Sequence, residues 1–202
     1  MQVESLVFIV ILILSVIIHE LSHGYAAEFL GDPTPRLQGR LTLNPFAHLD
    51  LFGSFIVPLL LILSGTGVIF GWAKPVQYNP YNLKNKKWGA SIVAIAGPLS
   101  NIFIAVVFAM LLRFSDVLML SEGVQTIFSS IVLVNIILPI FNLVPIPPLD
   151  GHHVLFDLLP QSMNNLKNFL RRNGWFLLIF FIFFLWQFVA PIIYSVYNIL
   201  VG

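Results

Sequence analysis

Cysteine is absent from this sequence, and charged residues are scarce. Asp, Glu, Lys and Arg together make up 9% of the 202 residues, whereas an ordinary soluble domain has about 25%. Without cysteine there is neither a disulfide framework nor a cysteine-ligated metal site. The net charge is only +1, and no basic stripe is present, which excludes a nucleic-acid-binding protein.

The chain is unusually rich in apolar residues. Hydrophobic types make up 58% of the residues, and 19 residues are Phe. A soluble fold of this size could not cover so much apolar surface with so few charges. This excludes an ordinary cytosolic enzyme and a disordered tail. We therefore expect a single integral membrane domain over residues 1–202, surrounded by the lipid bilayer.

The first apolar run, residues 6–18, lacks the flanks of a signal peptide. A signal peptide begins with a positively charged region and ends in small residues. Here the first charged residue is Glu4, and the run continues into His19 and Glu20. The pattern predicts a retained membrane helix over residues 3–30.

The positive charges predict how the chain crosses the membrane. Further apolar stretches cover residues 52–71, 88–113, 124–145 and 174–200. Nine of the ten Lys and Arg residues lie between these stretches, in the polar segments 31–50, 72–87 and 146–173. The positive-inside rule therefore places all three segments in the cytoplasm, and the short connection 114–123 outside.

The stretch 52–71 cannot cross under this topology, because the segments on either side of it share the cytoplasm. It should enter the membrane and return, and Gly53 and Pro58 interrupt its apolar run where a bend is needed. The alternative is a plain fifth crossing. The expected fold class is an all-α polytopic membrane protein with about four membrane-spanning helices and a re-entrant apolar hairpin.

Residues 36–43 alternate between polar and apolar types, with Leu37, Leu41 and Leu43 on one side. This period of two predicts a short β-strand or hairpin at the cytoplasmic interface. An unwound substrate could pair with the edge of such a strand. The alternative is a purely structural hairpin.

The sequence His19-Glu20-Leu21-Ser22-His23 fits the H-E-x-x-H pattern. On a helix the two histidines lie one turn apart on the same face, so both imidazoles can bind one zinc ion. Glu20 then lies where it can take a proton from zinc-bound water. The alternative is a helix whose polar residues merely face a bundle interior, but ionisable groups inside a membrane helix are expensive and usually functional.

A catalytic zinc site needs a third protein ligand. The predicted crossing at 124–145 returns the chain to the side of the two histidines and leads to Asp150. Gly151 allows a close turn there, so Asp150 is the predicted third ligand. The other candidates are His48, Asp50, His152, His153 and Asp157. For His48 and Asp50, loop capping is the favoured interpretation, and for the adjacent His152 and His153 it is an interfacial position.

Three motifs in this order resemble the site-2 protease family of intramembrane zinc metalloproteases. They are His19-Glu20-x-x-His23, Gly97-Pro98-x-x-Asn101 and Asn142-x-x-Pro145-x-Pro147-x-Leu149-Asp150-Gly151. Residues 43–53 and 71–76 resemble the compact bacterial or archaeal branch of that family. The resemblance implies a minimal core enzyme without a PDZ-like or nucleotide-sensing domain, in the cell membrane, with its active site toward the cytoplasm.

The resemblance also implies the chemistry of the site. One zinc ion would be held by His19, His23 and Asp150. Glu20 would be the catalytic base and would later donate a proton to the leaving amine. The substrates would be the membrane-spanning helices of other proteins, cut by zinc-activated water.

Asparagine side chains complete the predicted site. The resemblance implies that Asn142, and with it Asn101, offers amide donors to the substrate carbonyl or its oxyanion. The alternative for Asn101, Asn135 and Asn142 is hydrogen bonding between helices, worth roughly 0.6 kcal/mol each. This alternative is favoured for Asn135.

A membrane metal transporter or metal sensor could use the same histidines. Glu20 discriminates between the two hypotheses, because a transport site needs only ligands whereas hydrolysis also needs a base.

Overall fold

The computed structural model describes residues 2–50, 52–63 and 73–202. Within these ranges, four helical segments are long and apolar enough to cross a membrane: Ser5–Phe29, Gly89–Arg113, Glu122–Asn142 and Gln161–Val201. The predicted all-helical architecture with four such helices is confirmed. The chain is a multi-pass membrane protein.

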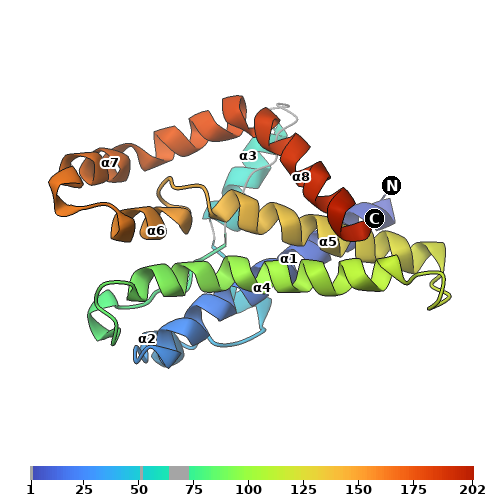
Figure 1. Cartoon of the computed structure of the whole chain (residues 1–202), viewed down its shortest axis with the longest axis horizontal. Coiled ribbons are helices and arrows are strands. Elements are labelled where there is room, and N and C mark those ends of the chain that lie inside the picture. Colours follow the sequence, from blue (N-terminus) through green and yellow to red (C-terminus); the bar gives the residue numbers. More distant parts are fainter. Residues whose placement is uncertain (1, 51, 64–72) are drawn as a thin grey trace.

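Three of these helices pack side by side (Figure 1). They are α1 (Gln2–Phe29), α4 (Gly89–Arg113) and α5 (Glu122–Asn142). Small residues let them approach closely, since Ala105 and Ala109 of α4 are almost fully buried in one core cluster with Val132 of α5. Close packing of small residues replaces the hydrophobic effect that would hold such helices together in water.

The last helical segment is bent. It consists of α7 (Asn164–Phe180), the π-helical turn η5 (Phe181–Leu185) and α8 (Trp186–Val201). Figure 1 shows the chain changing direction between α7 and α8, and π-helical turns are a common cause of such kinks. α8 packs on α4 and α5, and α7 lies away from them. The helix also begins ahead of the stretch 174–200, because its polar first turns contain no helix breaker.

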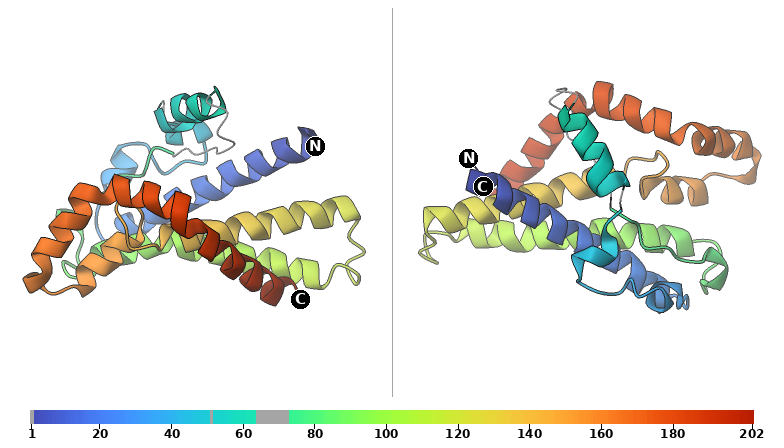
Figure 2. Two further views of the ribbon diagram at one scale, coloured as in Figure 1. Left: turned by 90° about the horizontal axis from the view of Figure 1, so that it is seen from above. Right: turned by 180° about the vertical axis from the view of Figure 1, so that it is seen from behind.

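Short elements connect the long helices. They are α2 (Thr34–Leu37), η1 (Pro45–His48), η2 (Phe52–Ile56), α3 (Val57–Leu63), η3 (Pro80–Asn82), α6 (Gly151–Leu158) and η4 (Gln161–Met163). Figures 1 and 2 show α2, α6 and the first turns of α4 and α7 at one end of the molecule. Both termini and the connection between α4 and α5 lie at the other end. Parts of all three polar segments thus lie at the same end as α2 and α6.

The strand predicted over residues 36–43 is wrong. The structure has the helical turn α2 up to Leu37 and turns and bends over residues 38–43, and no strand occurs in any described part of the chain. The carboxylate of Asp32 accepts a hydrogen bond from the first amide of the turn, and Pro35 lies within it. Gly39, at φ +65°, closes the turn in a Schellman arrangement. These capping residues outweigh a short alternation of apolar and polar side chains.

The predicted re-entrant hairpin over residues 52–71 lies partly outside the described residues, which end at 63 and resume at 73. The described part, η2 and α3, has five and seven residues. At about 1.5 Å per residue it is roughly 18 Å long, shorter than the ~30 Å hydrocarbon core. The hairpin remains a prediction.

Candidate metal centre

Two imidazoles and one carboxylate converge where α1 passes α4. His19 and His23 are 4% and 7% exposed, and their rings meet edge to face with centroids 4.6 Å apart. Oδ2 of Asp150, which directly precedes α6, lies 3.0 Å from Nε2 of His19 and 3.2 Å from Nε2 of His23. Donor atoms of all three residues lie within 4.8 Å of one another. Folding thus brings Asp150 to a motif 131 residues earlier in the chain.

The other ring nitrogen of each histidine faces an oxygen that can only accept. Nδ1 of His19 lies 2.6 Å from Oδ1 of Asn101, and Nδ1 of His23 lies 2.7 Å from the Val93 carbonyl oxygen. Each Nδ1 therefore carries the proton, which leaves a lone pair on each Nε2. Metal-ligating histidines are held in the same way by a partner on the second nitrogen.

The three converging atoms suit a cation. Two unprotonated imidazole nitrogens and a carboxylate oxygen are all electron donors, so they cannot share a hydrogen bond without a proton between them. Two nitrogens and one oxygen form a common catalytic zinc ligand set with a fourth position open. The residues present therefore fit a zinc ion.

Gly97 explains how α4 can pass so close to the two rings. A Cβ at this position would lie 2.5 Å from Nε2 of His23 and 2.7 Å from Nε2 of His19. Only glycine leaves room for both imidazoles here. The backbone of α4 thus closes one side of the site.

The segment that carries Asp150 is fixed by close backbone contacts. A Cβ at Gly151 would lie 2.1 Å from the Leu143 carbonyl oxygen at the end of α5, and one at Gly174 would lie 2.5 Å from the Pro147 carbonyl oxygen. Both glycines let the chain pack against a backbone oxygen where any side chain would collide. The segment is thereby held between α5 and α7.

Asp157 fixes the other end of α6. Its Oδ2 accepts hydrogen bonds from Oγ of Ser91 at 2.6 Å and from the Ser91 amide at 3.2 Å. This amide belongs to the first turn of α4, whose N–H groups have no partner within the helix. The carboxylate therefore caps α4 and ties it to the helix that begins at Gly151.

The charge of Asp150 is stabilised by its surroundings. Burial raises the pKa of its carboxyl group. When no metal is bound, a proton on Nε2 of His19 or His23 forms a hydrogen bond and an ion pair with the carboxylate, and these interactions outweigh burial. The net result holds the pKa of Asp150 well below its usual range. The lowered pKa favours the ionised carboxylate near pH 7.

Glu20 lies beside the converging atoms but is not one of them. Its Oε2 accepts a hydrogen bond of 2.7 Å from the amide of Val76. Val76 belongs to the irregular segment 73–79 that precedes η3. One carboxylate oxygen is thus anchored while the residue remains only half-buried.

Asn101 lies behind His19, where all of its polar atoms are occupied. It is fully buried, and its Nδ2 donates to Oδ1 of Asn135 at 2.7 Å. Asn135 in turn donates to Oγ of Ser15 at 2.9 Å. These bonds link α1, α4 and α5. Asn101 is therefore placed to orient the ring of His19, and its amide group is not free to bind a substrate.

Asn142 is half-buried at the end of α5. Its Nδ2 donates to the Leu138 carbonyl oxygen of the same helix at 3.0 Å. Unlike Asn101, Asn142 therefore forms no hydrogen bond with His19 or His23. Its predicted role as a donor to the substrate stays a prediction.

The remaining candidates lie outside the converging set. Nε2 of His48 pairs with the Thr42 carbonyl oxygen at 2.9 Å, and Asp50 accepts from the Gly53 amide at 2.7 Å. Both side chains thus bond to backbone groups of their own loop, which fits a loop-capping role. The rings of His152 and His153 lie 3.9 Å apart. Burial lowers the pKa of both histidines, that of His153 to about 4, which favours their neutral forms near pH 7.

Sequence reasoning missed the backbone groups of the site. The carbonyl of Val93 and the amide of Val76 carry no signal, because any residue other than proline supplies both groups. Ser15 could have been suspected from the sequence, because it is a polar residue one helical turn before His19 in an apolar run. Its partner Asn135 was recognised as an interhelical residue but not as part of the chain of bonds that reaches a metal ligand.

Comparison with known proteins supports the same interpretation. A profile of peptidase family M50 matches residues 7–119 and 114–185. "Putative zinc metalloprotease YwhC" of Bacillus subtilis is 37% identical over 190 residues, which cover 91% of this chain and 80% of that protein. "Putative zinc metalloprotease Rip2" of Mycolicibacterium smegmatis is 33% identical over 157 residues, covering 74% of this chain and 57% of that protein.

A zinc metalloprotease of Methanocaldococcus jannaschii is 26% identical over 162 residues, which cover 80% of this chain and 37% of that protein. No solved structure matches this chain. The Mycolicibacterium and Methanocaldococcus proteins are considerably longer than the regions that match this chain, which cover 57% and 37% of them.

Proposed function

Because this chain belongs to peptidase family M50 and is an intramembrane zinc metalloprotease, we propose that His19, His23 and Asp150 hold one zinc ion and that Glu20 is the general base. The substrates are peptide bonds in or near the transmembrane helices of other proteins. The observation that carries this proposal is the meeting of Asp150 with both Nε2 atoms, at 3.0 and 3.2 Å.

When bound, zinc supplies Lewis acidity toward water and the scissile carbonyl. The chain supplies the rest of the chemistry. Attack of water on the carbonyl carbon releases a proton, and the carboxylate of Glu20 can accept it. When the C–N bond breaks, the same carboxyl group can return the proton to the leaving amine nitrogen.

The amide of Val76 supports this role of Glu20. It binds one carboxylate oxygen and so limits rotation of the side chain, while the second oxygen remains available for the proton. A fixed base near the reacting atoms reduces the entropy that must be lost on reaching the transition state.

The asparagines have different proposed roles. Asn101 is a positioning residue, because its carbonyl oxygen holds the Nδ1 proton of His19. Asn142 is the proposed donor to the substrate carbonyl, and its bond to Leu138 would be exchanged for one to substrate. Loss of such a donor typically raises the barrier by about 3 kcal/mol.

The active site is proposed to face the cytoplasm. The polar segments hold nine of the ten Lys and Arg residues, and α2, α6 and the first turns of α4 and α7 lie at one end of the molecule (Figure 1). An excess of positive charge is typical of cytoplasmic loops. Asp150 lies in the last of these segments, 146–173, so the metal donors belong to the cytoplasmic half.

Replacement of Glu20 by Gln tests the proposal against the transporter hypothesis. Gln retains the size and the acceptor oxygen for Val76 but cannot take a proton. We expect Glu20→Gln to bind zinc as the wild type does, measured by metal analysis, and to cut a reconstituted transmembrane substrate at least about 100-fold more slowly. Full cleavage by this variant, or zinc flux into liposomes without cleavage by the wild type, would overturn the proposal.

A further inference from the structure

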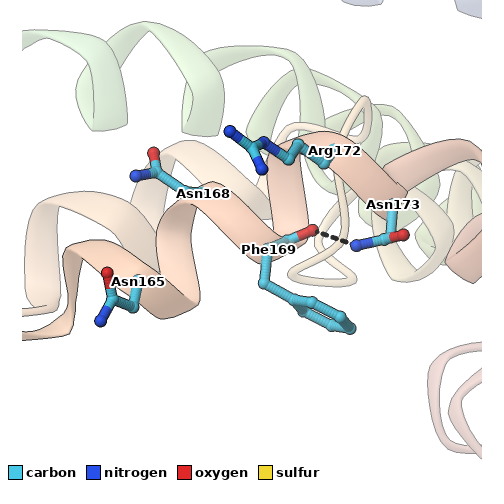
Figure 3. A pocket seen from close by; sticks show the side chains of 5 residues that line it. All are labelled: Asn165, Asn168, Phe169, Arg172 and Asn173. Atoms are coloured by element: carbon cyan, nitrogen blue, oxygen red, sulfur yellow. Dashed lines mark hydrogen bonds between the residues drawn. The ribbon is translucent and has the colours of Figure 1, made fainter.

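The first turns of α7 carry a polar surface that the proteolytic site does not use. Figure 3 shows the side chains that line a hollow of about 370 Å³ along this helix: Asn165, Asn168, Phe169, Arg172 and Asn173. Their spacing of three and four residues places them on one face, which we name the α7 polar face. Gly174 and Leu178, on the opposite side of the helix, are buried.

Arg172 is the available cation on the α7 polar face. Of the neighbouring cations, Lys167 donates to the Leu159 carbonyl oxygen at 2.9 Å, and Arg171 lies 5.0 Å above the ring of Phe156. Arg172 is exposed and forms no ion pair or hydrogen bond with the part of the chain that the structure describes. No Asp or Glu follows Asp157 in the sequence. Arg172 therefore remains available for a negatively charged ligand.

Amide groups adjoin this cation. Asn165 and Asn168 lie seven and four residues before Arg172, so all three side chains share the face, and Figure 3 shows the guanidinium of Arg172 on the same side of the helix as the amide of Asn168. Both asparagines are exposed. Guanidinium and amide donors together suit the oxygens of a phosphate group.

The α7 polar face also lies where a membrane surface is expected. Up to Arg172 the helix is rich in Asn and cations, whereas from Trp175 onward it is almost wholly apolar. Phe169 and Phe176 are 54% and 70% exposed. A helix that changes from basic to aromatic and apolar within one turn is typical of the headgroup level of a bilayer.

We propose that the α7 polar face binds the phosphate headgroup of an anionic phospholipid. Arg172 holds the phosphate oxygens in a bidentate contact, and Asn165 and Asn168 donate further hydrogen bonds to the headgroup. Phe176, one turn toward the apolar end of the helix from Arg172, contacts the first methylene groups of the acyl chains. The site depends only on the membrane location of the chain and is separate from the catalytic residues.

Native mass spectrometry of the full-length, zinc-loaded protein tests this proposal. Protein extracted from vesicles of equal parts phosphatidylglycerol and phosphatidylcholine should retain phosphatidylglycerol in preference. Arg172→Gln should lower the retained phosphatidylglycerol by more than about tenfold, because it removes the general attraction of one basic residue, about fivefold, and also the charged hydrogen bonds to the phosphate. Arg172→Lys should retain more of it than Arg172→Gln does.

Arg171→Gln is the matched control, because it removes the same charge from the adjacent position, where the cation already lies over Phe156. It should lower the retained phosphatidylglycerol by no more than about fivefold, the general attraction of one basic residue at an anionic surface. Equal losses in the two Gln variants would mean that only net charge matters and would overturn the site. Displacement of the lipid by millimolar inorganic phosphate would assign the site to free phosphate instead. Unchanged zinc content and thermal unfolding would show that Arg172→Gln is folded.

Discussion

The packed helices α1, α4 and α5 differ from the arm formed by α7, η5 and α8 in what they bury. In the packed helices, Ser15, Asn101 and Asn135 are at most 5% exposed and are joined by hydrogen bonds. In the arm, Phe183, Phe184 and Phe188 are 59–66% exposed. The packed helices bury polar side chains that orient the metal ligands. The arm instead exposes aromatic side chains on its surface, where we expect lipid. Substitutions should therefore affect zinc binding strongly in the first region and weakly in the second.

The largest effect is expected from Gly97→Ala. The added Cβ would lie 2.5–2.7 Å from the nitrogens of both imidazoles, so the rings or α4 must move. Overpacking of this kind typically costs about 1–3 kcal/mol, and here the strain falls on the metal ligands. We expect most of the bound zinc to be lost, as measured by metal analysis after dialysis.

Gly123→Ala is the control for this substitution. Gly123 also lies in a long helix, but a Cβ there meets no atom within 4 Å. Zinc content and stability should be retained or slightly improved, because Ala favours helix. If both variants kept their zinc, the close approach at Gly97 would not matter for the site.

Asn101→Leu should have the next largest effect. Leu is similar in size but removes the oxygen that accepts the Nδ1 proton of His19, and it removes the donor to Oδ1 of Asn135. Loss of such a second partner typically weakens metal binding 10–100-fold. Competition with a chelator measures this affinity. Asn142→Leu should leave it unchanged, and a similar loss in both variants would argue against a specific role for Asn101.

A smaller effect on stability, which depends on pH, is expected for Asp32 at the edge of the packed region. Burial raises the pKa of this carboxyl group, but hydrogen bonds from Thr34, Asn82 and the Asn79 amide outweigh burial and lower the pKa. A lowered pKa means that the contribution to stability is complete above the unfolded-state value, about 3.9, and is lost as the pH falls through the folded-state value.

The stability advantage of the wild type over Asp32→Asn should therefore be largest near neutral pH and shrink below about pH 4. Thermal unfolding in detergent from pH 7 to pH 3 measures it. An advantage that stayed constant over this range would show that ionised Asp32 is not what holds residues 79–82 against the end of α1.

The smallest effect is expected in the arm. Phe184 is 59% exposed, and Phe184→Leu keeps an apolar side chain toward lipid. The free energy of unfolding should change by less than about 0.5 kcal/mol, and zinc affinity should be unaffected. A loss of zinc on this substitution would erase the distinction between the two regions.

The long helices could be predicted because each carries one continuous apolar run, and a membrane leaves few other structures for such a run. The candidate site could be predicted from H-E-x-x-H and from the resemblance that joins it to Asp150. The alternation in residues 36–43 was misleading because eight residues are too few to outweigh Pro35 and the cap at Gly39. The support of the site by Val93, Val76 and the close contact at Gly97 could not be predicted, because these depend on distances between helices that no local pattern encodes.

X-ray absorption at the zinc edge of the purified protein tests the metal centre most directly. Two imidazole nitrogens and at least one oxygen should surround the zinc at about 2.0–2.2 Å, and Asp150→Ala should alter the oxygen scattering while the imidazole signal persists. A zinc environment that lacks imidazole in the wild type, or that is identical in Asp150→Ala, would contradict the proposed ligand set.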